Sequence, residues 1–338
     1  MRTHGSFLLV ISAGALAAGA AFAHHSPSAF DTRSQVTVEG TLTKVEWTNP
    51  HIYLTVETVG ANGQRALQQV ESVSISSAQS MGLRQDVLAL GSKVVVRANP
   101  NRRGSAFTVL GADITMGDGN TYAIGNAGRS SRPPTATVPA TGLASSWAPK
   151  QNPQLAPTVM GWPLTDKGRA ELGVVLSGQK KITIGCTALP LPMLMQLPQP
   201  RTLDVGAERV VMRIDSDGVE AARVIHLDLA AHPANVAPSL LGHSIGKWEG
   251  ATLVIDTVGF APHDLGIGFG IPSGLGKHLV ERLTLAENRL QLRYEVTIED
   301  PEYLAAPQTY TALWDHRPDL ASAVAACDAQ IAERFRQD

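Results

Sequence analysis

The sequence has no excess of charge of either sign, and this excludes one broad class of function. Lysine and arginine number 28 against 30 acidic residues, so the formal net charge is -2, and the 338-residue chain has no basic tail or stripe. Nucleic-acid binding depends on cationic side chains that neutralise phosphates, so we expect no nucleic-acid partner. Aromatic residues are few (5%), yet the hydrophobic fraction of 43% is ordinary for a folded protein and argues against wholesale disorder.

Signatures of several enzyme classes are also missing. The sequence contains no HExxH, P-loop or dinucleotide-binding glycine motif, so ATP and NAD enzymology is not indicated. A G-x-S-x-G element is absent too. The segment Gly242-His243-Ser244-Ile245-Gly246 resembles it only loosely, which makes Ser244 a weak candidate nucleophile. These absences favour a function that needs no organic cofactor.

Only one long apolar run occurs, and it lies at the start of the chain. Arg2 precedes the uncharged segment Phe7–Phe22, and Ala21-Phe22-Ala23 has the small-x-small form of a cleavage site. Residues 1–23 are therefore typical of a secretory signal peptide. A single membrane anchor is the alternative, but the segment is short for a span and rich in alanine and glycine. We expect a periplasmic or secreted protein with no stable membrane insertion after signal cleavage.

Cysteine is scarce, and its count fits that compartment. Cys186 and Cys327 are the two cysteines of the chain, with no CxxC motif and no metal-thiolate spacing. In an exported protein such a pair most simply forms one disulfide, although two free thiols are the alternative. The bond would close a loop of roughly 140 residues, worth about 4–5 kcal/mol in the chain-entropy description.

Residues 24–125 predict a small β-barrel domain. Val36–Trp47 and Ile52–Val59 alternate apolar and polar residues, the period-2 pattern of half-buried strands. Lys93–Ala98 and Ala106–Ile114 predict further strands, and Ser77–Ala89 predicts one short helix. Five strands and one helix in about 100 residues favour an OB-like arrangement.

The rest of the chain predicts a linker and a second β domain. Residues 126–160 are rich in proline, alanine and serine, so we expect an extended, semi-rigid linker there. Residues 161–338 begin with a short helix capped by Thr165, continue with six or more meandering strands, and end in a helix over Asp319–Phe335. The predicted fold is mainly β, with two antiparallel β-barrel or sandwich domains: an OB-like N-terminal domain and a C-terminal meander barrel.

The N-terminal motifs resemble those of a known group of proteins. His24-His25-Ser26 stands at the predicted mature terminus, followed by Val36-Thr37-Val38-Glu39-Gly40-Thr41 and Trp47-Thr48-Asn49-Pro50-His51. These stretches resemble a family of small exported bacterial proteins of unknown function that begin with AHHS and carry a WTNPH turn. The resemblance covers roughly residues 24–125 and implies no activity.

The C-terminal half resembles a second uncharacterised exported bacterial family, over about residues 163–328. Its matching stretches are Ile225–Asp228, His232-Pro233, Gly242–Gly250, Leu253–Phe260 and His278–Arg282, and both cysteines stand where that family places them. Ala261–Lys277 departs from the family, because a glycine-rich apolar sequence replaces the expected polar loop. The resemblance thus implies a rewritten substrate-facing loop, and again no activity.

The first candidate site is a metal site at the predicted mature terminus. Cleavage after Ala23 would leave His24 with a free α-amine and its own imidazole, and His25 or His51 would add a second imidazole. Such an all-nitrogen ligand set suits Cu(II). The alternative is a polar, frayed terminus at His24 and His25, with His51 capping a turn.

The second candidate site lies in the C-terminal half and suits acid–base chemistry. Histidine is fitted for proton transfer because its pKa lies near neutral pH. Strand alternation puts His278 and Arg282 on one face of a strand and Glu281 on the other. Structural roles are the alternative, with Glu281 and Arg282 as a surface pair and Asp256 as the cap of a strand end. The candidate catalytic residues are His243, His278, Glu249, Asp256, Glu281 and Arg282.

Two functions follow from these candidates. One is a periplasmic, cofactor-independent lyase, isomerase or hydratase acting on a small, mostly apolar or aromatic compound. In that enzyme His243 and His278 exchange protons, Glu249 or Asp256 orients an imidazole, and Arg282 holds an anion. The other is a non-catalytic periplasmic protein that binds a small-molecule ligand or copper.

Overall fold

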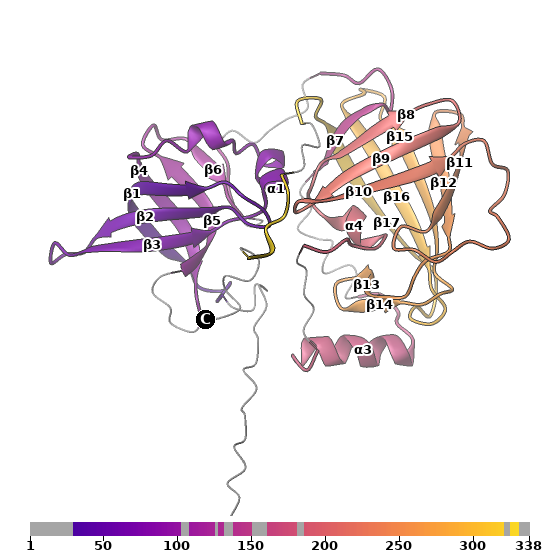
Figure 1. Cartoon of the computed structure of the whole chain (residues 1–338), viewed down its shortest axis with the longest axis horizontal. Coiled ribbons are helices and arrows are strands. Elements are labelled where there is room, and N and C mark those ends of the chain that lie inside the picture. Colours follow the sequence, from indigo (N-terminus) through magenta and orange to yellow (C-terminus); the bar gives the residue numbers. More distant parts are fainter. Residues whose placement is uncertain are drawn as a thin grey trace, which may run out of the picture.

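The strands of the chain form two barrel-like sheets, one from the N-terminal and one from the C-terminal part of the sequence (Figure 1). A computed structural model of the chain describes residues 30–102, 108–125, 128–131, 138–150, 161–180, 186–320 and 325–330. The predicted mainly-β fold class with two barrels is confirmed. The predicted signal peptide, residues 1–23, lies outside the described residues.

The N-terminal barrel has the OB-like order expected from the sequence. Strands β1, β2 and β3 form a meander, β4 pairs with β1, β5 pairs with β4, and a parallel β3–β5 pair closes the barrel. The strands are β1 (Val36–Glu46), β2 (Tyr53–Val59), β3 (Arg65–Glu71), β4 (Lys93–Pro100), β5 (Thr108–Met116) and β6 (Thr121–Ala123). Gly40 lets β1 cross close to β2, because a Cβ there would lie 2.1 Å from the carbonyl oxygen of Glu57.

The helical segment between β3 and β4 is shorter than predicted. In place of one helix over Ser77–Ala89, the structure has α1 (Ile75–Ser80) and a 3-10 turn, η2 (Gln85–Val87). Ser74 caps α1 by accepting a hydrogen bond from the backbone N–H of Ser77. Gly82, which has a φ of 91°, then turns the chain out of the helical conformation.

The C-terminal barrel is closed by nine described strands in the order β10-β11-β12-β15-β16-β17-β7-β8-β9. Neighbouring strands are antiparallel except β10 and β11, which run parallel. The meander prediction is therefore right for most of this barrel and wrong at that pair. The strands are β7 (Ser145–Pro149), β8 (Arg201–Val205), β9 (Arg209–Ser216), β10 (Val219–His226), β11 (His243–Glu249), β12 (Thr252–Val258), β15 (His278–Leu285), β16 (Gln291–Glu299) and β17 (Gln308–His316).

Two predicted boundaries need correction. β7 lies inside the predicted linker 126–160, yet it pairs with β8 on one side and β17 on the other, so residues 145–149 belong to the barrel wall. At the C-terminus, residues 325–328 are not helical, although a helix was predicted there. Both segments take their conformation from partners distant in sequence.

Small elements cover the C-terminal barrel. Helix α3 (Asp166–Leu176) begins at the predicted cap, Thr165, whose Oγ1 accepts a hydrogen bond from Gly168 N at 3.1 Å. It packs against the hairpin of β13 (His263–Gly268) and β14 (Ile271–Ser273), as Figure 1 shows. The short helix α4 (Met193–Gln196) contacts β13 as well. None of the described helices is long and apolar enough to cross a membrane.

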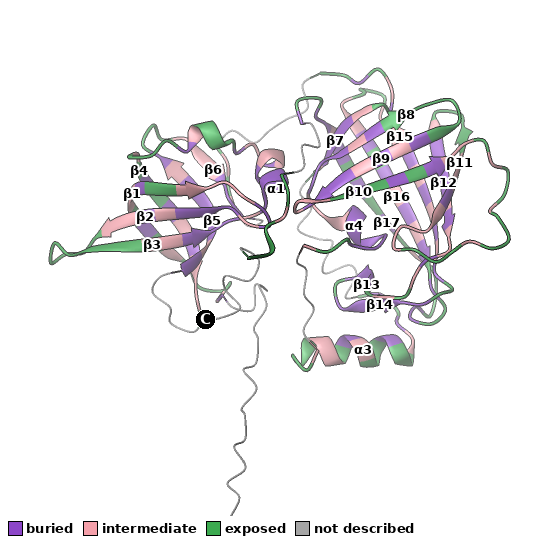
Figure 2. Ribbon diagram, viewed as in Figure 1, coloured by how far each residue is buried: buried purple, intermediate pink, exposed green. Residues whose placement is uncertain are grey.

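Burial alternates along the barrel strands, which separates an inner from an outer face (Figure 2). In β12, Leu253, Ile255 and Thr257 are 0% exposed, Val254 is 8% exposed, and Asp256 is half-exposed. This period of two sets the direction of each candidate side chain.

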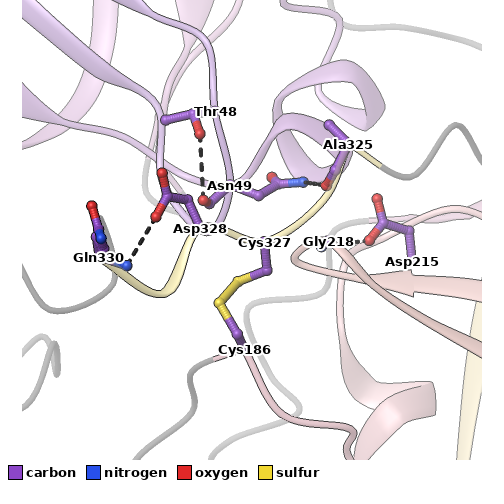
Figure 3. Close-up of a disulfide and its surroundings, with 9 residues drawn as sticks. All are labelled: Thr48, Asn49, Cys186, Asp215, Gly218, Ala325, Cys327, Asp328 and Gln330. Carbon is purple, nitrogen blue, oxygen red and sulfur yellow. Dashed lines mark hydrogen bonds between the residues drawn. A yellow bond between two sulfur atoms is a disulfide. The ribbon is translucent and has the colours of Figure 1, made fainter.

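A disulfide and several hydrogen bonds hold the segment 325–328 against both barrels (Figure 3). Cys186 and Cys327 are bonded, as predicted. Cys327 N donates to Gly218 O in the β9–β10 turn, and Asp328 N donates to Asn49 O in the N-terminal barrel. The Asn49 side chain donates to Ala325 O at 2.6 Å and accepts from Ile75 N at 3.0 Å. The WTNPH turn therefore holds the C-terminal segment.

Candidate acid–base site

Three of the predicted catalytic residues lie together on the outer face of the C-terminal barrel. His243 begins β11, Asp256 lies near the end of β12, and His278 begins β15. These strands are neighbours, with Ile245 opposite Asp256 and Asp256 opposite Val280. Antiparallel pairing thus brings the start of β11, the end of β12 and the start of β15 to one region of the wall.

A fourth residue, His232, joins them into one hydrogen-bonded chain. His278 Nε2 lies 2.9 Å from Asp256 Oδ2, and His232 Nε2 lies 2.8 Å from Asp256 Oδ1. The other ring nitrogen of His232, Nδ1, lies 2.8 Å from Nδ1 of His243. The sequence of contacts is His278–Asp256–His232–His243, which we call the His–Asp chain.

His232 comes from the segment 227–242, which connects the parallel strands β10 and β11. The connection begins at the end of β10, and β11 then starts beside that end, because Ile225 is paired with Ser244. His226 and His243 are consequently neighbours, with parallel rings whose centroids are 5.2 Å apart. Sequence reasoning did not include His226 or His232 among the catalytic candidates. His226 ends β10, and its approach to His243 follows from the parallel pairing of β10 and β11. His232 lies in a loop, where strand alternation predicts no side-chain direction. The stretches Ile225–Asp228 and His232-Pro233 were the available signals.

The two ends of the His–Asp chain differ in proton affinity. Burial lowers the pKa of His243, and the adjacent His232 and His226 lower it further. Burial also acts to lower the pKa of His278, but the hydrogen bonds and charges of Asp256 and of Glu299, whose Oε2 lies 3.5 Å from His278 Nδ1, outweigh it and raise the pKa above 6.5. Near neutral pH His243 is therefore the better base and His278 the better acid.

Asp256 is held in its charged form. Burial alone would raise its pKa, yet the hydrogen bonds from His278 and His232 bring it below 3.8. Both carboxylate oxygens thus act as acceptors, one for each imidazole. The Asp256 side chain remains 39% exposed and His278 30% exposed, so solvent and small molecules can reach this end.

Two predicted catalytic residues lie elsewhere on the outer face. Glu249 ends β11 and forms an ion pair with Arg282, at 2.9 Å between Oε2 and Nη2. Lys247 also pairs with Glu249. Arg282 does share the outer face with His278, as alternation predicts, but its charge is already matched. Among the described residues Glu249 has no hydrogen bond with a histidine, whereas Asp256 has two.

Glu281 lies on the opposite face of β15 from His278, as the strand alternation predicts, and belongs to a separate buried cluster rather than to a surface pair with Arg282. Arg223 donates to Glu281 Oε1 at 3.0 Å and also to Oε2, and Tyr294 OH donates to Oε1 at 2.9 Å. Ser244 Oγ accepts from Arg223 Nε and lies 3.0 Å from Thr257 Oγ1. Ser244 is 1% exposed, which rules it out as a surface nucleophile.

The predicted metal site lies mostly outside the described part of the chain. His24 and His25 are not among the described residues. His51 Nδ1 lies 2.9 Å from Ser72 O and 3.6 Å from Glu71 Oε1, so its ring is held by β3 and the residue that follows it. Among the residues that the structure describes, no group of three His, Cys, Asp or Glu side chains is placed to hold a metal ion.

Comparison with known proteins gives a family for the N-terminal part alone. Residues 13–110 match the model of a family of unknown function (DUF6152). This supports the resemblance seen in the N-terminal motifs and brings no activity. No curated protein matches the chain. The resemblance of the C-terminal half to a second exported family stays a prediction.

Proposed function

We propose that the C-terminal barrel is an acid–base enzyme of the lyase, isomerase or hydratase type. Its substrate is a small, mostly apolar or aromatic compound, and its place of action is the periplasm. The observation that carries the proposal is the His–Asp chain, in which one hydrogen-bonded series joins a histidine of lowered pKa to one of raised pKa. Such a separation of proton affinities is a common property of acid–base sites.

The hydrogen bonds determine which nitrogen acts as the base. Ionised Asp256 can only accept, so His232 Nε2 carries a proton and donates it to Oδ1. Neutral His232 then has an unprotonated Nδ1, which accepts from Nδ1–H of His243. Neutral His243 therefore carries its lone pair on Nε2. Of the described residues, none forms a hydrogen bond with that atom, which leaves it available to take a proton from a substrate carbon or water.

The remaining members stabilise the proton once it has moved. When His243 becomes charged, His232 and Asp256 compensate that charge through the chain, as a carboxylate does for an imidazolium. Protonated His278 donates through Nε2 to Asp256 from the other side, and its second N–H, at Nδ1 and 3.5 Å from Glu299 Oε2, supplies the acid of the pair. Arg282 is matched by Glu249 and is not part of this proposal.

The test is hydrogen exchange from carbon. The protein would be incubated in D2O with a panel of small ketones, enones and aryl-substituted carboxylic acids, and deuterium incorporation would be followed by NMR. We expect exchange with at least one compound. In His243→Gln the exchange rate should fall by about 100-fold or more, which is the usual contribution of a general base to the rate. Lys247→Gln, on the outer face of the same strand, is the control and should exchange at the wild-type rate. Equal rates in wild type and His243→Gln would refute the proposal.

A non-catalytic, copper-binding role is the second candidate. The observation in its favour is the single imidazole of His51, held beside Glu71 in the N-terminal barrel. Metal analysis and intact mass of protein purified with its native terminus test it. Stoichiometric copper on a chain that starts at His24, lost in His51→Ala, would support this role, and metal-free protein would refute it.

A further inference from the structure

The interior of the C-terminal barrel holds a second arginine, Arg201, in an environment unlike that of Arg223. Arg201 is the first residue of β8 and is fully buried, at 0% exposure. Its Nη2 donates to the carbonyl oxygen of Leu197 at 3.1 Å. Within the described part of the chain, Nε and Nη1 of Arg201 have no hydrogen-bond partner.

Comparison of the two arginines shows what Arg201 lacks. Arg223 has a buried carboxylate, Glu281, and hydroxyl partners on Ser244 and Thr257. The described residues offer Arg201 no carboxylate within ion-pair distance. A buried guanidinium stays charged, and an unmatched buried charge is far more costly than a paired one. The interior of this barrel is therefore one negative charge short at Arg201.

Aromatic side chains lie beside this cation, and one of them, Trp314, is an unpartnered donor as well. The guanidinium carbon of Arg201 lies 4.4 Å from the centre of the Trp314 ring. Trp314 stacks on Tyr294, and Tyr294 contacts Tyr310 edge to face. Trp314 Nε1 has no hydrogen-bond partner among the described residues. Arg201 and Trp314 thus bring three unpaired donor atoms to one buried aromatic cluster.

We propose that the C-terminal barrel binds a small organic carboxylate inside it, with the carboxylate on Arg201. The anion would supply the missing negative charge, and its oxygens would accept from the unpaired nitrogens of the guanidinium. The aromatic faces favour a carboxylate with an apolar or aromatic body over a strongly hydrated ion such as phosphate. This site is independent of the outer His–Asp chain.

The site is tested by calorimetric titration with three pairs of probes. The probes are acetate, hexanoate and benzoate, each matched with its uncharged amide: acetamide, hexanamide and benzamide. We expect at least one carboxylate to bind one per chain, and its amide to bind tenfold more weakly or not at all. Failure of all three carboxylates to bind, or equal binding of acid and amide, would overturn the proposal without any variant.

Variants then locate the site. Arg201→Met removes the charge but keeps an unbranched apolar side chain, and it should reduce carboxylate affinity at least tenfold. The control is Arg213→Gln in β9, an arginine near the same strand but exposed and paired with Asp204. Arg213→Gln and His243→Gln should both bind the carboxylate as wild type does, which separates this site from the proposed catalytic one. Wild-type affinity in a folded Arg201→Met protein would show that the ligand binds elsewhere.

Discussion

At the scale of single residues, the chemistry of the outer site depends on one carboxylate shared by two imidazoles. Burial lowers the pKa of His278, whereas Asp256 and Glu299 raise it. The net direction is upward, because the 2.9 Å hydrogen bond to Asp256 and the contact of Nδ1 with Glu299 at 3.5 Å favour the protonated ring. Asp256 therefore favours the charged form of His278 and, through His232, one tautomer of His243.

Asp256→Asn should consequently lower the pKa of His278 relative to the wild type. The asparagine carries no charge, so only Glu299 is left to oppose the effect of burial. A histidine whose pKa is raised in the folded state stabilises the fold below pH 6.5, and this contribution is lost as the pH rises through the folded-state pKa. The variant should lose part of that pH dependence. Histidine NMR titration measures the pKa, with Glu249→Gln as the control that leaves His278 unchanged.

A second residue-scale prediction concerns Lys277, the buried last residue of the glycine-rich segment 261–277. Burial lowers its pKa to about 7, although its Nζ donates to Leu191 O and Gly266 O and lies over the Phe260 ring. Above pH 7 the folded chain therefore binds fewer protons at Lys277 than the unfolded chain does, until about pH 10.5. The free energy of unfolding should rise with pH in that window.

The slope from Lys277 is at most roughly 1.4 kcal/mol per pH unit. Urea unfolding between pH 7 and 10 measures it, and Lys277→Met should flatten the curve. A wild-type curve that falls over this range, with no change in Lys277→Met, would contradict the prediction.

At the scale of elements, the β9–β10 hairpin connects local turn chemistry to the disulfide. Asp217 and Gly218 have φ values of 55° and 91°, the pair of positive angles of a two-residue type I′ turn, and the Ser-Asp-Gly sequence predicts such a hairpin. Asp215 Oδ1 accepts from Gly218 N at 2.6 Å. On its other side Gly218 meets the C-terminal segment, because a Cβ there would lie 2.5 Å from Cys327 N.

Gly218→Ala should therefore lower the free energy of unfolding by more than the strain of an alanine with positive φ accounts for. Gly250→Ala is the matched control: Gly250 lies in the β11–β12 turn with a φ of 60°, and nothing lies within 4 Å of its added Cβ. The control should cost about 1–2 kcal/mol, the usual cost of a left-handed alanine. Gly218→Ala should cost clearly more, as measured by chemical unfolding. Equal losses in the free energy of unfolding would mean that the segment 325–328 moves away from the added methyl group without destabilising the protein.

The elements also show what a sequence reveals and what it does not. Period-2 alternation in Val36–Trp47 and the Ser-Asp-Gly turn are local signals, and they predict β1 and the β9–β10 hairpin correctly. β7 carries no such signal, since five residues in a proline-rich stretch become a strand only by pairing with β8 and β17. The parallel β10–β11 pair is equally non-local. Alternation predicted the opposite directions of His278 and Glu281, but not His232, whose loop position follows from that parallel pair.

At the scale of the whole molecule, residues 325–328 couple the two barrels. The segment is bonded to Cys186 and Gly218 on the C-terminal side and to Asn49 on the N-terminal side. Asn49 is fully buried and uses its side-chain oxygen and nitrogen as well as its carbonyl. A hydrogen bond from Arg317 Nη1 to Ser80 O, at 3.2 Å, also crosses between the barrels. Each barrel, by contrast, has its own hydrophobic core.

Removal of the disulfide should therefore separate the unfolding of the two barrels. With Cys186 and Cys327 bonded, the segment that Asn49 binds is anchored to the C-terminal barrel, so we expect one calorimetric transition. In the double variant Cys186→Ser/Cys327→Ser, the 141-residue loop opens. The C-terminal barrel should then lose about 4–5 kcal/mol on the chain-entropy description. The weakened anchor should leave the N-terminal barrel to melt independently, which gives two transitions.

Asn49→Ala, which keeps the disulfide but removes the side-chain contacts to Ala325 and Ile75, should instead destabilise mainly the N-terminal barrel. A single, displaced transition in the double variant would show that the barrels are coupled by contacts other than residues 325–328.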